Sequence, residues 1–142
     1  MIEQSVGDVM TRSVHTITGE MTACDVAVLF AEHEIGSAVV VAPETDEVIG
    51  IVTESDIMQQ VAAGADIESI RVESFLSAPV ITIASSESIH TAADKMRTQS
   101  IRRLPVVDNG DLVGIITTTN LTHYLPRLRN TILRGRKEFS GQ

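Results

Sequence analysis

Short runs of apolar residues follow one another in the same order in both halves of this 142-residue chain. A brief alternating stretch comes first, at 14–17 and again at 80–83, and its period of two is typical of a strand. Apolar residues at helical spacing follow, and then two runs rich in valine and isoleucine, separated by a polar turn. A helix closes each half. The pattern therefore predicts the order strand, helix, strand, strand, helix, twice.

Capping residues indicate where the two longer helices begin. Thr22 and Asp25 have the spacing of a capping box, in which each side chain accepts a hydrogen bond from a backbone N–H at the helix start. The matching helix of the second half is expected to begin near Ser88. The faces that these helices are expected to bury consist of Ala23, Val26, Ala27 and Phe30 in the first half and Ile89, Ala92, Ala93 and Met96 in the second.

Polar turns separate the two later strands of each half. Asn109 and Gly110 are typical of a tight hairpin because both tolerate positive φ, whereas the first half has the longer turn 42–47. The remaining expected elements are closing helices over 54–63 and 118–125, and short helical turns over 6–10 and 72–76.

The two halves also match residue by residue. Gly-Ile-Val-Thr at 50–53 falls on Gly-Ile-Ile-Thr at 114–117, and Asp56 falls on Asn120, although the second turn is shorter by two residues. A repeat of this length indicates two similar supersecondary units, and each is small enough to be marginal alone, so we expect them to pack together. The predicted layout is a first repeat over 5–64, a linker over 65–71, a second repeat over 72–125 and a basic helix or tail over 126–142.

Composition and charge narrow the class of protein. Hydrophobic residues make up 43% of the chain, and the single cysteine, Cys24, excludes an internal disulfide and is expected to be a packed thiol. No apolar run approaches the roughly 18–20 residues of a membrane span, and the first residues lack a signal pattern. We therefore expect a cytoplasmic protein with no membrane association. A net charge of −8 disfavours nucleic acid as a partner.

No arrangement of residues typical of catalysis stands out. The sequence has no Walker-type glycine loop, no dinucleotide fingerprint, and no Ser/His/Asp or Cys/His group in a recognisable context. The four histidines lack the spacing of metal ligands. We therefore expect no catalytic residues, no metal and no catalytic cofactor.

Two motifs resemble a known family. LPVVD at 104–108 and the pattern G-I-V-T-x-x-D at 50–56, together with the element order, look like paired cystathionine-β-synthase (CBS) domains, the Bateman module. The resemblance covers about residues 5–125. It implies an α/β (α+β) fold of tandem repeats, each a small three-stranded sheet with two helices, packed about a pseudo-twofold axis. It also implies a stand-alone module that associates as a flat homodimer.

The resemblance implies regulatory binding of adenosyl ligands, namely AMP, ADP, ATP or S-adenosylmethionine, in clefts between the repeats. At the matching positions, Asp56 would accept hydrogen bonds from a ribose diol and Thr53 would offer a hydroxyl to ribose or phosphate. The helix start after Thr53 favours an anion. Arg102 and Arg103 match the position of a phosphate-contacting base, and a guanidinium binds phosphate through parallel hydrogen bonds. The segments against the adenine would contain Thr16, Ile17, Thr82 and Ile83.

The two implied sites are not equivalent. Gly36 and Ser37 occupy the phosphate position in the first repeat, so only the second repeat has arginines there. The second repeat in turn has an amide in place of the ribose carboxylate, and an amide is a weaker acceptor than a charged group. The family's arrangement groups Thr53 and Asp56 with 80–83, and Thr117 and Asn120 with 14–17.

Other interpretations of these residues stay open. Thr-x-x-Asp after a strand is also an ordinary capped helix start, and the arginine pair also suits a solvated surface. Gly50 and Gly114 fit close backbone packing or a bulge as well as ligand access. The alternative function is a structural or adaptor CBS pair with degenerate pockets that acts through protein–protein contacts. In either case the regulated protein is unknown.

The carboxyl-terminal segment differs from the rest in charge. Residues 126–142 carry five basic residues and one acidic residue, a net charge of +4, whereas residues 1–125 carry 6 and 18, a net charge of −12. Pro126 is expected to end or kink the preceding helix. Two roles are consistent with this charge. The segment could be a basic arm that binds an anionic partner, or a helix that docks on an acidic neighbour, including a second subunit. Docking is favoured because an apolar face needs cover, and that face consists of Leu121, Leu125, Leu128 and Ile132.

Overall fold

The computed structural model describes residues 4–77 and 80–124. Its contacts divide the chain into two compact units. The first-repeat unit contains the described residues of 13–81 together with 109–112. The second-repeat unit contains the described residues of 1–12, 82–108 and 113–142. The predicted tail, 126–142, lies outside the described residues.

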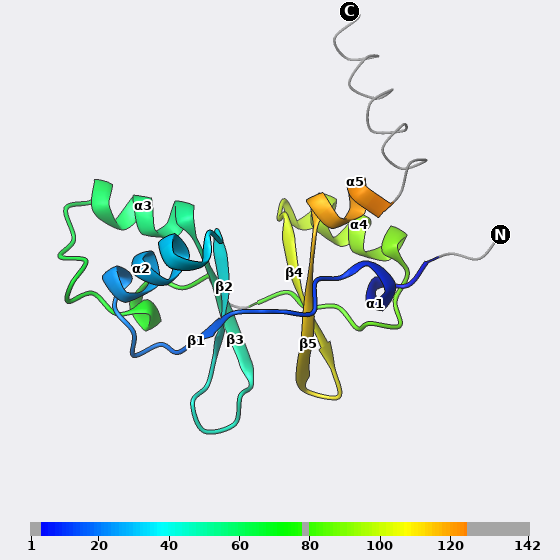
Figure 1. The fold of residues 1–142 in the computed structure, drawn as a ribbon, viewed down its shortest axis with the longest axis horizontal. Helices are drawn as coiled ribbons and strands as arrows, with labels where there is room; N and C mark the ends of the chain where they lie inside the picture. Colours follow the sequence, from blue (N-terminus) through cyan, green and yellow to red (C-terminus); the bar gives the residue numbers. More distant parts are fainter. Residues whose placement is uncertain (1–3, 78–79, 125–142) are drawn as a thin grey trace, which may run out of the picture. The chain divides into compact units, whose positions relative to one another are not determined.

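The first-repeat unit is a three-stranded sheet with helices on one face (Figure 1). Its central strand β2 pairs in parallel with β1 and antiparallel with β3. Figure 1 shows α2 and α3 on the same side of this sheet, as the element order predicts. The elements are β1 (Thr16–Ile17), α2 (Ala23–His33), β2 (Ser37–Val41), β3 (Val48–Thr53), α3 (Glu54–Ala62) and the 3₁₀ helix η1 (Val72–Ser74).

The second-repeat unit repeats this plan with a shorter first strand. Its elements are α1 (Val6–Val9), α4 (Ile89–Gln99), β4 (Arg103–Asp108), β5 (Asp111–Thr117) and α5 (Thr118–Tyr124). The strand expected over 80–83 is reduced to one parallel bridge between Ile83 and Val106. Beside this bridge, Lys95 Nζ donates to the Thr82 carbonyl at 3.0 Å. The mixed α/β class and the element order are confirmed.

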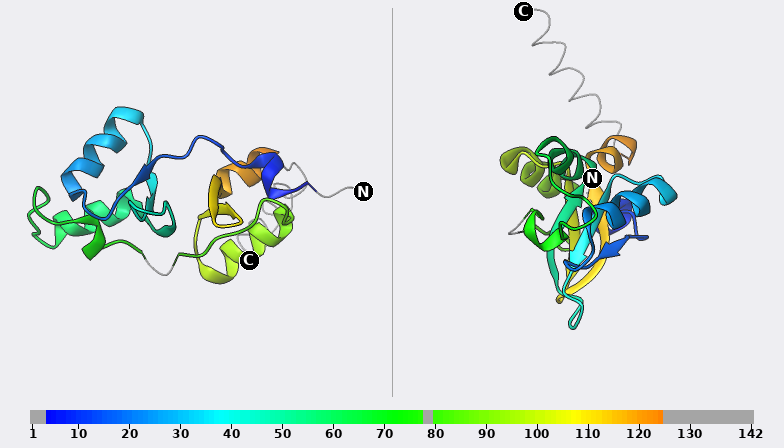
Figure 2. Two further views of the ribbon diagram at one scale, coloured as in Figure 1. Left: turned by 90° about the horizontal axis from the view of Figure 1, so that it is seen from below. Right: turned by 90° about the vertical axis from the view of Figure 1, so that its left-hand side faces the viewer.

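Local sequence signals account for the caps and turns. Asp25 N donates to Thr22 Oγ1 at 3.1 Å and Thr22 N donates to Asp25 Oδ2 at 3.0 Å, so the predicted capping box is present. Thr91 N donates to Ser88 Oγ at 3.1 Å at the start of α4. The β4–β5 turn has the positive φ angles predicted for a tight hairpin, 52° at Asn109 and 85° at Gly110. In both units the hairpin turn extends away from the helices (Figure 2).

The predicted helix faces supply much of the core. On each of α2 and α4, three of the four residues that were expected to be buried are buried. The exceptions are Ala27 and Ala93, which are partly buried because each lines a groove. The core cluster of the first-repeat unit consists of Ile17, Val26, Phe30, Ala38, Val40, Val52 and Val72. Among the described residues, no helix is long and apolar enough to cross a membrane.

The two short helices pack in the unit of the opposite repeat. α1 lies at the start of the predicted first repeat, yet Val6 N donates to Glu87 O at 2.8 Å and Gly7 N donates to Ser85 O at 2.9 Å, both in the second-repeat unit. Reciprocally, Val72 N in η1 donates to Met21 O at 2.9 Å in the first-repeat unit. Each structural unit is therefore completed by a segment from elsewhere in the chain.

Candidate ligand-binding site

The start of α3 holds the carboxylate for which a ligand role is implied. Thr53 N and Thr53 Oγ1 donate to Asp56 Oδ2, at 2.8 and 3.1 Å, and Asp56 N donates to Thr53 Oγ1 at 3.4 Å. Both side chains are partly buried, and the capping interpretation is confirmed. Within the described part of the chain, the second carboxylate oxygen, Oδ1, receives no hydrogen bond. Asp56 can therefore cap the helix with one oxygen and still offer the other to a ligand.

The start of α5 has the same geometry but a different chemical group. Thr117 N and Thr117 Oγ1 donate to Asn120 Oδ1, at 2.9 and 3.0 Å, and Asn120 N donates to Thr117 Oγ1 at 3.1 Å. The amide nitrogen, Asn120 Nδ2, donates to Thr11 Oγ1 at 3.3 Å. The only oxygen of this side chain is therefore already used by the cap, in contrast to Asp56.

Thr11 is a contact that the sequence did not indicate, because 109 residues separate it from Asn120. It belongs to an extended segment that pairs with the middle of β5 through a bridge between Thr11 and Ile115. The other repeat has the equivalent bridge, between Ser77 and Ile51 of β3. The extended segment that contains Thr11 thus lies beside β5, which ends at Thr117. In the same way, the segment that contains Ser77 lies beside β3, which ends at Thr53.

Two glycines permit this close approach. A Cβ at Gly50 would lie 2.9 Å from the Ser77 carbonyl oxygen and 2.5 Å from Leu76 Cδ1. A Cβ at Gly114 would lie 2.8 Å from the Thr11 carbonyl oxygen and 2.6 Å from Met10 Sδ. Close backbone packing therefore explains both glycines of the repeated motif.

The arginine pair lies beside the start of α5. Thr118 N donates to Arg102 O at 3.1 Å, and the equivalent bond in the first repeat runs from Glu54 N to Gly36 O at 3.0 Å. The backbone positions aligned from the sequence are thus structurally equivalent. Arg102 is exposed and Arg103 partly buried, and neither guanidinium forms an ion pair with another described residue.

The segments expected at the adenine contribute differently. Ile17 and Ile83 are each 2% exposed, so their side chains are part of the protein interior. Thr16 is exposed on β1, and Thr82 is partly buried. The threonine side chains at 16 and 82 are therefore more accessible to a ligand than the two isoleucine side chains.

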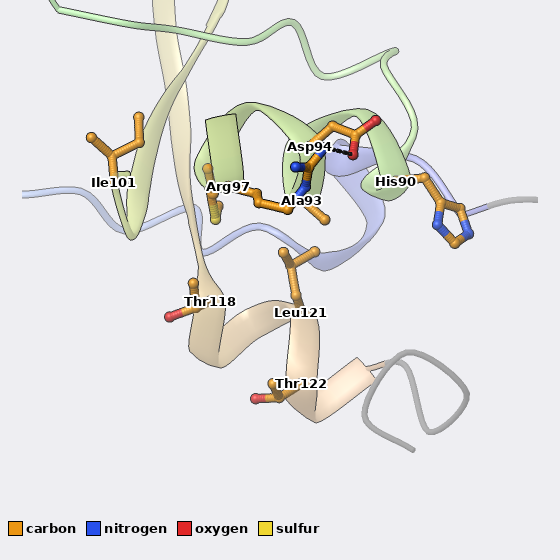
Figure 3. A pocket seen from close by; sticks show the side chains of 9 residues that line it. His90, Ala93, Asp94, Arg97, Ile101, Thr118, Leu121 and Thr122 are labelled. Atoms are coloured by element: carbon orange, nitrogen blue, oxygen red, sulfur yellow. Dashed lines mark hydrogen bonds and ion pairs between the residues drawn. The ribbon is translucent and has the colours of Figure 1, made fainter. Parts of the chain in front are cut away.

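A groove lies between the two helices of each repeat. The one between α4 and α5 has a volume of about 500 Å³, and Asp94 and Arg97 form an ion pair of 3.4 Å at its edge (Figure 3). The one between α2 and α3 has a volume of about 440 Å³. Equivalent residues line both, including Ile35 and Ile101. Within the described ranges, no group of three His, Cys, Asp or Glu side chains is placed to hold a metal ion.

Comparison with known families fits this architecture. The CBS domain profile matches residues 6–63 and 72–127. This chain belongs to the CBS domain family. The resemblance seen in the two motifs is confirmed, and the chain contains a pair of CBS domains.

Three known proteins illustrate the similarity. The uncharacterized protein MK0525 of Methanopyrus kandleri is 39% identical over 137 residues, which are 95% of this chain and 69% of that protein. The structure of CBS domain protein PAE2072 from Pyrobaculum aerophilum, complexed with AMP, matches with a TM-score of 0.81 at 27% identity, over 89% of this chain and 96% of that chain. A homoserine O-acetyltransferase of Methanococcus vannielii is 33% identical over 122 residues, 85% of this chain, but this chain spans only 25% of that enzyme.

Proposed function

We propose that this CBS pair is a regulatory module that binds an adenosyl compound, with Asp56 and Thr53 as the ribose-binding groups. The observation that carries the proposal is the Asp56 carboxylate beside a helix start, one oxygen of which receives no hydrogen bond from the described residues. A carboxylate accepts hydrogen bonds from a diol more strongly than a neutral group does. The AMP complex of the Pyrobaculum CBS protein supports adenine nucleotides as the ligand class.

The second repeat contributes charge rather than a carboxylate. Arg102 and Arg103 are not neutralised by another described residue, so they can bind phosphate oxygens. Asn120 is a weaker ribose acceptor because its oxygen is used in the cap. We therefore expect two unequal sites, one dependent on Asp56 and one on the arginines and Thr117.

The proposed role is regulation by binding rather than catalysis. The module would act in the cytoplasm as a homodimer and would pass the ligand's presence to a protein that is still to be identified. AMP, ADP, ATP and S-adenosylmethionine are the candidate ligands. Binding of the folded state alone, at 100 times the dissociation constant, would stabilise the fold by about 2.7 kcal/mol.

Calorimetry and thermal unfolding with these four compounds test the proposal. We expect heat of binding with at least one compound, a melting temperature raised by several degrees, and complete recovery of the unchanged ligand. No heat and no shift with any of the four would favour the adaptor function instead. Consumption of the ligand would contradict a purely regulatory role.

Variants at the helix starts test the assigned residues. Asp56→Asn keeps a capping oxygen but removes the charge, so we expect affinity at the first site to fall about tenfold or more, given about 1.5–3 kcal/mol for a hydrogen bond to a charged group. Asp25→Asn is the matched control, because Asp25 caps α2 in the same way.

Arg103→Ala should weaken nucleotide binding more than adenosine binding, and Asn120→Asp should strengthen the second site. Equal losses from every change would contradict unequal sites.

A further inference from the structure

Two threonines fix the orientation of the Asn120 side chain. Thr117 N donates to Asn120 Oδ1 at 2.9 Å, and because a backbone N–H can only donate, the atom that faces it must be the amide oxygen. The amide nitrogen therefore lies on the other side, where Asn120 Nδ2 donates to Thr11 Oγ1 at 3.3 Å. Outside the cap, Asn120 thus presents N–H groups rather than an oxygen.

One hydrogen of this amide is available to a ligand. Asn120 Nδ2 carries two hydrogens, and within the described part of the chain Thr11 Oγ1 is the acceptor for one of them. The bond lies at the surface, since Thr11 is exposed and Asn120 is partly buried. The second repeat therefore offers a hydrogen-bond donor at the position where Asp56 of the first repeat offers a charged acceptor.

The first repeat has no such pair. Ser77 occupies the position of Thr11, because each forms a bridge with the strand that leads to the cap. Among the described residues, the hydrogen bonds of the Asp56 side chain go to Thr53 and not to Ser77. An ionised carboxylate has no hydrogen to donate, and it repels a second anion placed beside it. The two cap positions therefore favour ligand groups of opposite hydrogen-bonding character.

The charge around Asn120 also favours an anion. Thr118 N donates to Arg102 O at 3.1 Å, so the arginine pair lies beside the start of α5. Neither guanidinium forms an ion pair with another described residue. Residues 13–81 carry one basic and twelve acidic residues, whereas residues 82–124 carry four of each. An anionic group therefore meets less repulsion in the second repeat than in the first.

We propose that the second repeat binds an adenosyl compound whose ribose carries a phosphate at the 2′ or 3′ position. The Asn120 amide, oriented by Thr11, donates to that phosphate. The inference rests on the proposed function and names the ligand class for one of its two sites. A phosphate offers acceptor oxygens and negative charge, which an amide N–H and nearby guanidinium groups complement. At the first repeat the Asp56 carboxylate repels the same group and favours an unmodified diol.

Calorimetry with isomeric phosphates tests the proposal. The full chain with Asp56→Ala, which weakens the first site, is titrated with ADP, adenosine 2′,5′-bisphosphate and adenosine 3′,5′-bisphosphate. Each compound carries two phosphate groups, so they differ mainly in where the second group is attached. We expect at least one bisphosphate to bind about tenfold or more tightly than ADP, the usual effect of a hydrogen bond to a charged group. In the unaltered chain, that bisphosphate should also shift the NMR signal of the Asn120 side-chain amide.

Variants of the amide and of its partner provide the controls. Asn120→Asp keeps a capping side chain, as Asp56 does in the first repeat, but replaces the donor by a negative charge. We expect this variant to reverse the preference, so that ADP binds more tightly than either bisphosphate. Thr11→Val removes the hydroxyl that orients the amide and should reduce the preference about two- to tenfold, whereas Thr11→Ser should retain it. Ser77→Ala, at the equivalent position of the first repeat, is the matched control and should leave the preference unchanged.

Three outcomes would overturn the inference. The first is binding of ADP at least as tight as that of both bisphosphates, and the second is a preference that persists in Asn120→Asp. In both cases an adenosyl compound still binds, so the proposed function stands. The third is no heat with any of the three compounds, after which the titrations with AMP, ATP and S-adenosylmethionine decide the proposed function separately. Binding of a bisphosphate alone would support the inference and would remove ADP from the candidate ligands.

Discussion

Asp108 connects the end of β4 to the loop before α4. Ser85 Oγ donates to Asp108 Oδ2 at 2.5 Å, and Ser85 N donates to Asp108 Oδ1 at 2.9 Å. Both bonds lower the pKa of the Asp108 carboxyl, and the bond from the Ser85 hydroxyl has the larger effect. Burial raises this pKa by a smaller amount. Because Ser85 O also accepts from Gly7 N, this carboxylate helps to fix the loop on which α1 rests.

The lowered pKa predicts a dependence of stability on pH. A carboxyl whose pKa is lower in the folded state stabilises the fold above its unfolded pKa, and that contribution is lost as the pH falls through the folded value. We expect Asp108→Asn to lower the melting temperature at neutral pH and to make its decline below about pH 4 shallower. Asp111→Asn, at the exposed start of β5, is the control. Parallel curves for Asp108→Asn and the unaltered protein would contradict this role.

At the scale of elements, the extended segments that contain Ser77 and Thr11 lie against β3 and β5, at the positions of Gly50 and Gly114. The sequence showed both glycines and offered packing and ligand access as alternatives. The structure favours packing, because a Cβ at either glycine would lie 2.8–2.9 Å from the Ser77 or Thr11 carbonyl oxygen, which is closer than ordinary contact allows. The same contact brings Thr11 to Asn120.

Alanine at either glycine should therefore destabilise the fold. We expect Gly50→Ala and Gly114→Ala each to lower the free energy of unfolding by about 1–3 kcal/mol, the usual cost of overpacking a filled site. Urea unfolding measures this loss. Ile49→Val, one position earlier on β3, serves as the control because Ile49 is partly exposed, and it should cost less. A stability equal to that of the unaltered protein would leave ligand access as the reason for the glycines.

At the scale of the whole molecule, α1 and η1 complete the units of the opposite repeats. Val6 and Val72 occupy equivalent positions in the repeat, and both are fully buried. Because α1 bonds to 85–87 and η1 bonds to Met21, each helix should stabilise the unit that it contacts rather than the repeat in which the sequence placed it.

Paired substitutions test this exchange. Val6→Ala and Val72→Ala should each lower stability by about 1.6 kcal/mol or more, at about 0.8 kcal/mol for each of two buried methylene-sized groups. Amide hydrogen exchange under native conditions reports local opening. We expect faster exchange in α4 and β5 for Val6→Ala, and in α2 and β2 for Val72→Ala. The reverse assignment would show that each short helix supports its own repeat.

The sequence by itself determined the features that depend on nearby residues. The element order, the box of Thr22 and Asp25, the hairpin at Asn109-Gly110 and the equivalence of Asp56 with Asn120 all follow from spacings of a few residues. Backbone periodicity, capping and turn conformation are local, so the pattern predicts them. The first strand of the second repeat was overestimated: Ile83 forms a single bridge with Val106, and the extent of such pairing depends on tertiary packing that a local pattern does not encode.

Only the tertiary structure decided which distant groups meet. Thr11 reaches Asn120, and α1 rests on the second repeat. Each of these depends on how segments far apart in the chain pack, and no local spacing encodes it. The sequence thus indicated Asp56 and Asn120 as equivalent candidates for ligand contact. Among the described residues, the packing leaves one oxygen of Asp56 without a hydrogen bond, whereas both polar atoms of the Asn120 side chain are engaged.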